Sequence, residues 1–313
     1  MTGPEITVVI PTFDRPDRLR RALEGTLRHH DGVAIEVVVV DDGSTDEGAV
    51  ATAVATATRG NTVPVSLVRQ ANQGPAAARN AGAAAAAGAV VLFLDDDCVP
   101  DPGCIGTHRA VQACATASSE GLAVLGRARW DPDLPVSPLM HVAMRGAQFD
   151  YDGIADPNDV PFSRFYTACA SVPRERFLGM GGFDTTLPRY AAGEDTEFAW
   201  RWVQGGGRIA YRANATVRHD HHLELRPFLE RQRRAGRAAV EVVARHPELF
   251  EALGLDAIAD VSAREQFYVA LMRYAFVIGV EEGLGAPARP DDLPGEHLRS
   301  VVEEWLPVWA VTA

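Results

Sequence analysis

The sequence predicts an α/β fold in which a mainly parallel sheet is covered by helices on both faces. Four short apolar runs alternate with helical patterns in the first hundred residues, at 6–10, 35–40, 65–68 and 90–94. Near-continuous apolar runs are typical of strands buried on both faces, and their alternation with helices is typical of parallel strands joined by crossover helices. We therefore expect a Rossmann-like sheet in this half of the chain.

Each of the first three strands is followed by signals for a helix. Apolar residues recur at helical spacing from 19 to 27, after the first strand. Turn residues at 41–44 follow the second strand and precede an Ala-rich helix that we expect to end near Arg59. The third helix is expected to begin at Pro75 and to end near Gly88, because proline suits a first helical position and glycine follows helix ends.

The regular alternation stops after Pro100, and the second part of the chain has a different pattern. Residues 130–161 are rich in Pro, Asp and Gly and predict a long loop region beside the site. From Arg226 onward the pattern is helical, which predicts a C-terminal helical extension. The apolar stretch 268–280 is too short to cross a bilayer and predicts a packed helix.

Composition excludes several classes of function. The net charge of -12 argues against a general nucleic-acid surface, since phosphate backbones require clustered basic charge. The sequence has no lysine, which excludes a P-loop, a Schiff base and a lysine general base. The four cysteines have no CxxC pair, so reduced thiols are expected.

A strand within five residues of the start predicts no signal peptide, and we expect a cytoplasmic protein without a transmembrane segment.

Three carboxylates, Asp95, Asp96 and Asp97, directly follow the fourth strand. Ligands of open α/β sheets bind outside the carboxyl ends of the strands, and a hard divalent cation held by carboxylates completes its shell with substrate phosphates. The triplet therefore predicts a metal site that meets a nucleotide diphosphate. The alternative is a solvated acidic turn.

Asp42 follows the second strand and is expected at the same rim of the sheet, where a carboxylate can accept hydrogen bonds from a nucleoside. Its alternative is an Asx-turn, because Asp-Gly-Ser is also good turn chemistry. Arg79 lies on the first turns of the third helix and could reach a phosphate or a base edge. A solvated surface arginine is the alternative for Arg79.

Several segments in order carry a resemblance to a known family. They read Val-Ile-Pro-Thr-Phe-Asp-Arg at 9–15, Val-Val-Asp-Asp-Gly-Ser-Thr-Asp at 39–46, Asn-Gln-Gly at 72–74, Ala-Arg-Asn-Ala-Gly at 78–82, Phe-Leu-Asp-Asp-Asp at 93–97, Gly-Gly-Phe-Asp at 181–184 and Gly-Glu-Asp-Thr-Glu-Phe-Ala-Trp-Arg at 193–201. Together they resemble bacterial members of glycosyltransferase family 2, with the GT-A fold, over residues 5–222. The resemblance implies a GT-A domain at 1–222, with a nucleotide-binding half at about 1–100 and an acceptor half at about 101–222, followed by the helical extension at 223–313.

The resemblance also implies roles for individual residues. Asp97 matches the metal ligand, within a one-residue ambiguity in the triplet, and His219 can complete the shell of Mn²⁺ or Mg²⁺. Asp195 matches the general base, and Glu194 orients loops or binds the acceptor. The implied donor-binding residues are Pro11, Thr12, Asp14, Asp42, Asn72, Arg79, Asp95 and Asp96.

Two of these assignments have structural alternatives. Asp195 and Glu194 could simply complement the dipole at the start of a helix. His219 could belong to a polar surface turn, although a neutral imidazole suits Mn²⁺ better than Mg²⁺. His221 is a weaker candidate at the same place.

The function expected from this resemblance is transfer of a hexose from a nucleotide-diphosphate donor, UDP-linked, to a hydroxyl acceptor, with inversion at the anomeric carbon. A retaining transferase, a sugar nucleotidyltransferase and a non-catalytic nucleotide-sugar binding protein stay open. Residues 130–161 and the C-terminal helices are expected to select the acceptor. A homodimer, or a peripheral membrane contact through those helices, also stays open.

Overall fold

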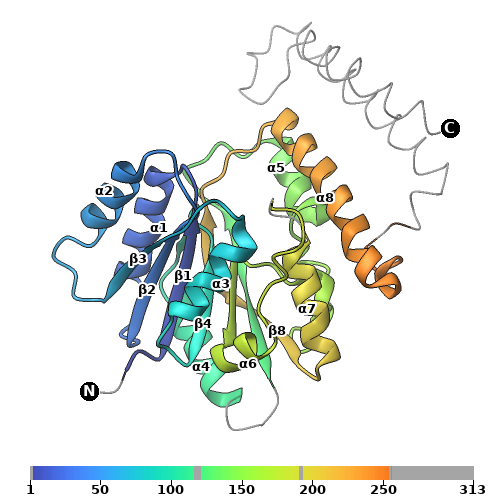
Figure 1. Ribbon diagram of the computed structural model, residues 1–313, viewed down its shortest axis with the longest axis horizontal. Coiled ribbons are helices and arrows are strands. Elements are labelled where there is room, and N and C mark those ends of the chain that lie inside the picture. The colour runs from blue at the N-terminus through green and yellow to red at the C-terminus, as the bar shows by residue number, and fades with distance from the viewer. Residues whose placement is uncertain (1–2, 116–120, 190–192, 254, 256–313) are drawn as a thin grey trace, which may run out of the picture. The chain divides into compact units, whose positions relative to one another are not determined.

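The structure is a computed structural model that describes residues 3–115, 121–189, 193–253 and 255 of the chain (Figure 1). Among these residues an eight-stranded sheet has the order β3-β2-β1-β4-β7-β6-β8-β5. Its strands are β1 (Ile6–Thr12), β2 (Ile35–Asp41), β3 (Val65–Arg69), β4 (Val90–Leu94), β5 (Cys98–Pro100), β6 (Leu122–Trp130), β7 (Cys169–Pro173) and β8 (Arg208–His219). The α/β fold class that the sequence predicts is confirmed.

Helices connect the strands and follow the last one. They are α1 (Pro16–Arg28), α2 (Glu47–Ala57), α3 (Pro75–Ala85), α4 (Cys104–Ala115), α5 (Pro138–Val142), a π-turn (Ala143–Ala147), a 3₁₀ turn (Phe162–Arg164), α6 (Arg174–Gly179), α7 (Glu194–Gln204), α8 (Leu225–Arg245) and a 3₁₀ turn (Pro247–Leu249). The helix predicted from Arg226 onward is therefore present as α8.

The third helix ends earlier than the sequence pattern predicts. Helix α3 ends at Ala85, and Ala86 is already extended, with φ of −65° and ψ of 141°. Gly88 does not end the helix. A glycine is required there because a Cβ atom would lie 2.6 Å from the backbone nitrogen of Thr7. The glycine thus lets the chain pass close to β1 before it enters β4.

The strand order reverses between β1 and β4, which are parallel neighbours in the centre of the sheet. Right-handed crossovers place α1 and α2, which run from β1 to β2 and from β2 to β3, on one face of the sheet. The crossover from β3 back to β4 goes in the opposite direction, so α3 covers the other face (Figure 1). This reversal makes a topological switch point, the usual ligand site of open α/β sheets.

The second half of the sheet is mixed. Strand β7 lies antiparallel between β4 and β6, and β5 lies antiparallel to β8, whereas β6 and β8 are parallel. Four of the seven pairings among the described strands are therefore parallel. The region 130–161, predicted as a loop, contains α5 and the π-turn between otherwise irregular segments.

Four phenylalanine rings, Phe93, Phe177, Phe183 and Phe198, pack below the end of β4. In five of the six pairs the centroids lie 5.0 to 5.3 Å apart in tilted and edge arrangements, which aromatic rings prefer. Phe93 belongs to β4 and Phe198 to α7, so the cluster ties the strand before the Asp triplet to the helix that begins at Glu194. It fixes the position of that helix relative to the rim.

We expect Phe198→Ala to lower the free energy of unfolding by about 3–5 kcal/mol, because it leaves a cavity among these rings. Phe198 is 1% exposed. Urea denaturation measures the change. Val203→Ala on the same helix is the control, since Val203 is 37% exposed and a surface change of this kind costs within about 0.5 kcal/mol. A Phe198→Ala loss as small as that of the control would contradict the packing argument.

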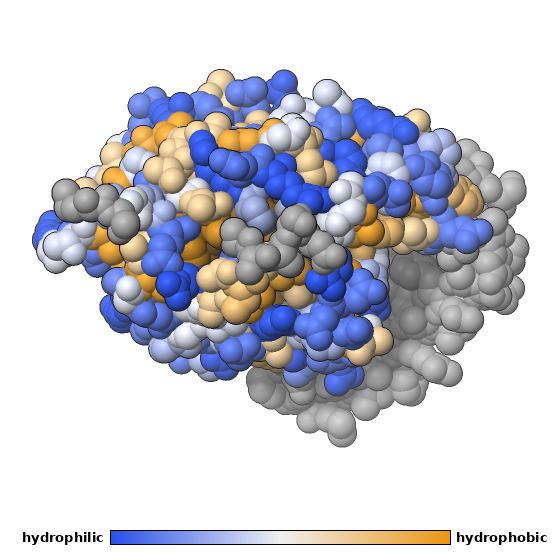
Figure 2. Space-filling view, turned by 90° about the horizontal axis from the view of Figure 1, so that it is seen from below, coloured by the Kyte–Doolittle hydropathy of each residue, from blue (hydrophilic) through white to orange (hydrophobic). Residues whose placement is uncertain are grey.

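The chain divides into two compact units. One comprises residues 1–136 and 141–222, and the other comprises residues 137–140 and those from 223 onward. The predicted helix at 268–280 lies outside the described residues, so the division into a domain at 1–222 and an extension at 223–313 stays a prediction. No helix among the described residues is both long and apolar enough to span a membrane. On the face in Figure 2, hydrophilic and hydrophobic residues are interspersed.

Candidate functional site

The carboxyl ends of β1, β2 and β4 bring the predicted donor-side residues to one rim of the sheet. Thr12 at the end of β1 pairs in register with Asp41, the residue before Asp42. The Thr12 hydroxyl donates a 2.8 Å hydrogen bond to Asp96, across the switch point between β1 and β4. Because parallel strands end together, the Asp triplet and Asp42 share this rim.

Asp97 lies in a group with His219 and His221 whose ligand atoms are all within 4.8 Å of one another. The distance from Asp97 Oδ1 to His219 Nε2 is 3.3 Å, and that from Asp97 Oδ2 to His221 Nδ1 is 3.0 Å. Antiparallel pairing sets Cys98 opposite His219, and the backbone N–H of Asp220 donates to the carbonyl of Asp97. The register of β5 and β8 thus builds this group.

The group fits a divalent cation. Two ligand atoms about 2.1 Å from an octahedral ion and at right angles to each other are about 3.0 Å apart, close to the 3.3 and 3.0 Å separations in the structure. One carboxylate and two imidazoles favour a transition metal such as Mn²⁺ over Mg²⁺. Burial lowers the pKa of His221, which favours the neutral ring that a metal requires. Although burial alone would raise it, the pKa of Asp97 is held well below its usual range by His219 and His221.

His219 is held in place by aromatic rings. Its ring stacks on Trp130, with centroids 5.2 Å apart and planes 11° apart, and the edge of Phe149 meets it at 5.9 Å. Its buried Nδ1 atom has no hydrogen-bond partner among the described residues. This packing orients Nε2 toward Asp97. The sequence ranked His221 below His219, but the structure brings both imidazoles to the same carboxylate.

Arg79 joins the two halves of the site. Its guanidinium is buried and makes ion pairs of 2.8 Å with Asp95 and 3.0 Å with Glu194. Asp95 follows β4, whereas Glu194 is the first residue of α7, 115 positions after Arg79. Both terminal nitrogens of the Arg79 guanidinium therefore already have protein partners, and the predicted contact of Arg79 with the nucleotide stays a prediction.

Asp195 lies in the first turn of α7, which begins after Gly193 in the left-handed conformation, with φ of 88°. Only glycine adopts that conformation without strain, so Gly193 sets the angle at which the helix starts. Burial and the charge of Glu194 raise the pKa of Asp195 to about 7, although Arg79 opposes the shift. A carboxylate with such a pKa is suited to accept a proton near neutral pH.

The residues predicted for the nucleoside end are tied together by hydrogen bonds. The Asp42 carboxylate accepts from the side chain of Gln70 at 2.7 Å and from the backbone N–H groups of Gln73 and Gly74 at 2.9 and 2.8 Å. Asp14 accepts from the N–H of Thr45 at 2.7 Å. Both carboxylates thus brace loops of the rim.

Two other predicted donor-side residues lie near these loops. Pro11 is half-buried within β1, one residue before its end, and Asn72 is exposed in the loop before α3. The carbonyl of Asn72 accepts a 3.5 Å hydrogen bond from Arg189. The structure does not test the donor contacts predicted for Pro11 and Asn72, so these contacts stay predictions.

We expect Asp42→Ala to lower the free energy of unfolding by about 1–3 kcal/mol, because two backbone donors lose their acceptor. Donor affinity should fall in the same variant, by about tenfold or more, if the nucleoside also bonds to this carboxylate. Urea denaturation and calorimetric titration of UDP measure the two effects. A loss of stability with unchanged donor affinity would assign Asp42 to the turn alone.

Sequence reasoning missed two arginines at the start of α1. Arg15 contacts Asp96 and Asp97, and Arg18 contacts Asp97 and His221. The available signal was their position, because Arg15 immediately precedes α1 and Arg18 lies in its first turn, directly after the carboxyl end of β1.

Comparison with known proteins supports the family resemblance. Residues 7–110 match the model of the family described as glycosyl transferase family 2. The chain is 29% identical over 254 residues to the pre-mycofactocin glycosyltransferase of Mycobacterium tuberculosis, a match that covers 79% of this chain and 50% of that protein. It is 40% identical over 94 residues to the succinoglycan biosynthesis protein ExoO of Rhizobium meliloti, covering 30% of this chain and 26% of that protein. The chain thus spans half the length, or less, of these relatives.

Solved structures support the fold. A mannosyltransferase from Pyrobaculum calidifontis, in complex with GDP-Man and Mn²⁺, matches with a TM-score of 0.60 and 18% identity, over 98% of this chain and 81% of that one. GalNAc-T7 with UDP, GalNAc and Mn²⁺ matches with a TM-score of 0.52 and 19% identity, over 71% of this chain and 44% of that one. At these identities the likeness concerns the fold.

Proposed function

We propose that this chain transfers a sugar from a nucleotide-diphosphate donor to a hydroxyl acceptor, because residues 7–110 match the model of glycosyl transferase family 2 and its fold resembles that of solved glycosyltransferases. One observation carries the proposal. A carboxylate–imidazole group suited to a divalent cation and a carboxylate suited to a base are organised around one rim, linked by the ion pairs of Arg79 with Asp95 and Glu194.

Asp97 and His219, with His221, would hold Mn²⁺ or Mg²⁺ at the carboxyl end of β4. When bound, such an ion neutralises negative charge on the departing diphosphate. Asp95 and Asp96 lie beside this group and would contact the ribose. The rim loops that Asp14 and Asp42 brace would receive the nucleoside.

Asp195 would accept the proton of the acceptor hydroxyl as that oxygen attacks the anomeric carbon. Its raised pKa supports this role, because a base that titrates near the working pH combines availability with proton affinity. Glu194 would hold the start of α7 through its bond to Arg79. Attack opposite the leaving diphosphate would invert the anomeric configuration.

We take a UDP-linked sugar as the donor, with acceptor choice assigned to residues 130–161 and to the extension after 222. The Pyrobaculum neighbour was solved with GDP-Man and GalNAc-T7 with UDP, so both nucleotides belong in the test.

The proposal is tested with the full chain, Mn²⁺ or EDTA, and a panel of UDP- and GDP-linked sugars. Calorimetry should show UDP binding that is stronger with Mn²⁺, and the wild-type protein should release UDP from at least one donor. Binding without release from any donor would favour a non-catalytic binding protein. Pyrophosphate formation from UTP and a sugar phosphate would indicate a nucleotidyltransferase. NMR of the anomeric proton in the product separates inversion from retention.

A further inference from the structure

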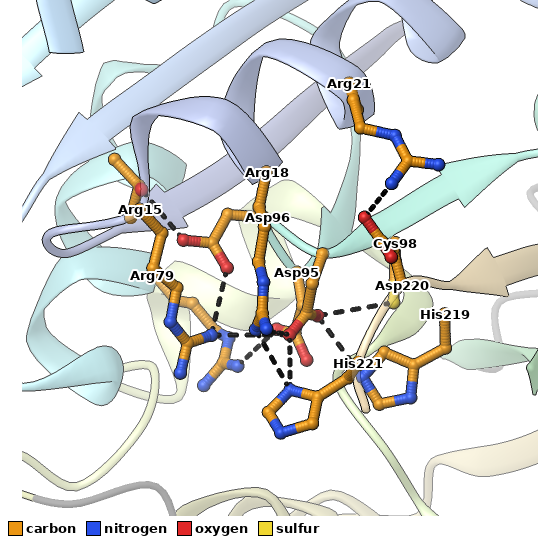
Figure 3. A network of polar contacts seen from close by, with 12 residues as sticks. Arg15, Arg18, Arg21, Arg79, Asp95, Asp96, Cys98, His219, Asp220 and His221 are labelled. Atoms are coloured by element: carbon orange, nitrogen blue, oxygen red, sulfur yellow. Dashed lines mark hydrogen bonds and ion pairs between the residues drawn. The ribbon is translucent and has the colours of Figure 1, made fainter. Parts of the chain in front are cut away.

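Two arginines from the start of α1 reach into the candidate metal group (Figure 3). Arg15 Nη1 lies 3.3 Å from Asp96 Oδ1 and 3.3 Å from Asp97 Oδ2. Arg18 Nη1 lies 3.5 Å from the same oxygen of Asp97 and 3.2 Å from His221 Nδ1. These contacts place guanidinium charge on the atoms that would ligate a cation.

A guanidinium and a divalent cation cannot both keep these contacts. An ion about 2.1 Å from Asp97 Oδ2 and His221 Nδ1 would lie within a few ångströms of Arg18, and the two positive charges would repel each other. Arg18 and Arg15 can turn away, since their side chains are 34% and 46% exposed. They would then turn toward the nearest new negative charge.

The diphosphate of a donor supplies that charge at the same place. Guanidinium binds phosphate oxygens with two parallel hydrogen bonds, a geometry that ammonium lacks. The chain has no lysine, so every side chain that could neutralise a phosphate permanently is an arginine. Arg15, the residue before α1, and Arg18, in its first turn, face the rim through their contacts with Asp96 and Asp97.

We propose that Arg15 and Arg18 exchange partners during donor binding. They neutralise Asp96 and Asp97 before the donor arrives, and they bind its diphosphate once a cation has taken their place on Asp97 and His221. The proposal deepens the function given above and rests on it. It makes cation and donor bind cooperatively, because the donor attracts the arginines that otherwise oppose the cation.

The test is Arg18→Met, which keeps much of the apolar stem and removes the charge. Titrated with Mn²⁺ alone, the variant should bind the ion about two- to fivefold more tightly than the wild-type protein, the range that partly exposed ion pairs give. Titrated with UDP at saturating Mn²⁺, it should bind about tenfold or more weakly, because charge-assisted hydrogen bonds to phosphate are lost. The two effects have opposite signs.

Arg20→Met is the matched control on the same helix. Arg20 pairs with Glu24 at 2.7 Å, so the dissociation constants of Arg20→Met for Mn²⁺ and UDP should stay at their wild-type values. Arg15→Met should repeat the pattern of Arg18→Met, and it serves as the second variant if Arg18→Met fails to fold.

Three results would overturn the exchange. Weaker binding of both Mn²⁺ and UDP would make Arg18 a structural support of the metal group. Weaker binding of UDP with unchanged Mn²⁺ affinity would make it a phosphate ligand that does not compete. Unchanged dissociation constants for Mn²⁺ and UDP would mean that the contacts of Arg18 with Asp97 and His221 are surface contacts without a role in binding. A wild-type protein that binds Mn²⁺ but no nucleotide would instead defeat the proposed function, while tighter Mn²⁺ binding by Arg18→Met would still report the competition.

Discussion

Replacing Asp195 with asparagine is expected to lower kcat by about 10²–10⁴, the usual contribution of a general base. Asparagine keeps the shape and an oxygen that can accept the 2.8 Å bond from the N–H of Thr196, but it cannot take a proton. Affinities for UDP and Mn²⁺ and the thermal midpoint should therefore stay close to the wild-type values. Steady-state kinetics, calorimetry and thermal unfolding measure the three quantities.

The pH dependence of the transfer rate is a second test of Asp195. As the proposed base, Asp195 must be deprotonated to act, and its pKa is raised to about 7, so activity should rise with pH through that value. Between pH 6 and pH 8 the deprotonated fraction, and with it the rate, should increase about tenfold. The Asp195→Asn variant should lack this rise.

Asp17→Asn is the control, because Asp17 also lies in the first turn of a helix but is exposed. Near-wild-type transfer by Asp195→Asn would remove Asp195 from the role of base and favour Glu194 or a substrate-assisted path. A parallel loss of stability and activity would favour a role in the helix start alone.

Replacing Asp97 with alanine is expected to weaken Mn²⁺ binding by more than about 100-fold, since even residues that only support a metal ligand account for 10- to 100-fold. At a Mn²⁺ concentration that just saturates the wild-type protein, the UDP affinity of the variant should fall to the value that the wild-type protein shows in EDTA. Calorimetric titration of Mn²⁺ and then UDP tests both statements.

The fold should survive this change, because Asp97 follows the end of β4 and its side chain pairs with polar groups rather than with the apolar core. Asp220→Asn is the control on the same rim. Asp220 pairs with Arg21 and lies outside the candidate metal group, so its replacement should leave Mn²⁺ affinity unchanged. Wild-type Mn²⁺ and UDP affinities in Asp97→Ala would disprove the assignment of the ligand.

Local sequence patterns were sufficient to predict the strands and helices of the first half of the chain. The apolar run at 90–94 predicts β4 because a strand buried on both faces needs apolar residues at every position, and the position of the Asp triplet at the rim follows. The end of α3 was misjudged, because Gly88 serves a close approach to β1 that no local pattern encodes.

The site could be predicted only in part, because much of it depends on long-range pairing. His221 reaches Asp97 through the register of β5 and β8, and this register depends on packing between segments more than a hundred residues apart. The ion pair between Arg79 and Glu194 likewise requires α7 to rest on the phenylalanine rings. Residue types predicted the chemistry, and tertiary contacts decided which atoms meet.

The buried guanidinium of Arg79 links the proposed donor rim to the proposed base. It lies between Asp95 at the donor rim and Glu194 beside the proposed base, and its charge opposes the rise in the pKa of Asp195. If the donor contacts Asp95 or Arg79 as proposed, donor occupancy and protonation of Asp195 would be coupled equilibria. By thermodynamic reciprocity, whatever free energy a bound donor adds to or removes from proton binding at Asp195, that proton adds to or removes from donor binding.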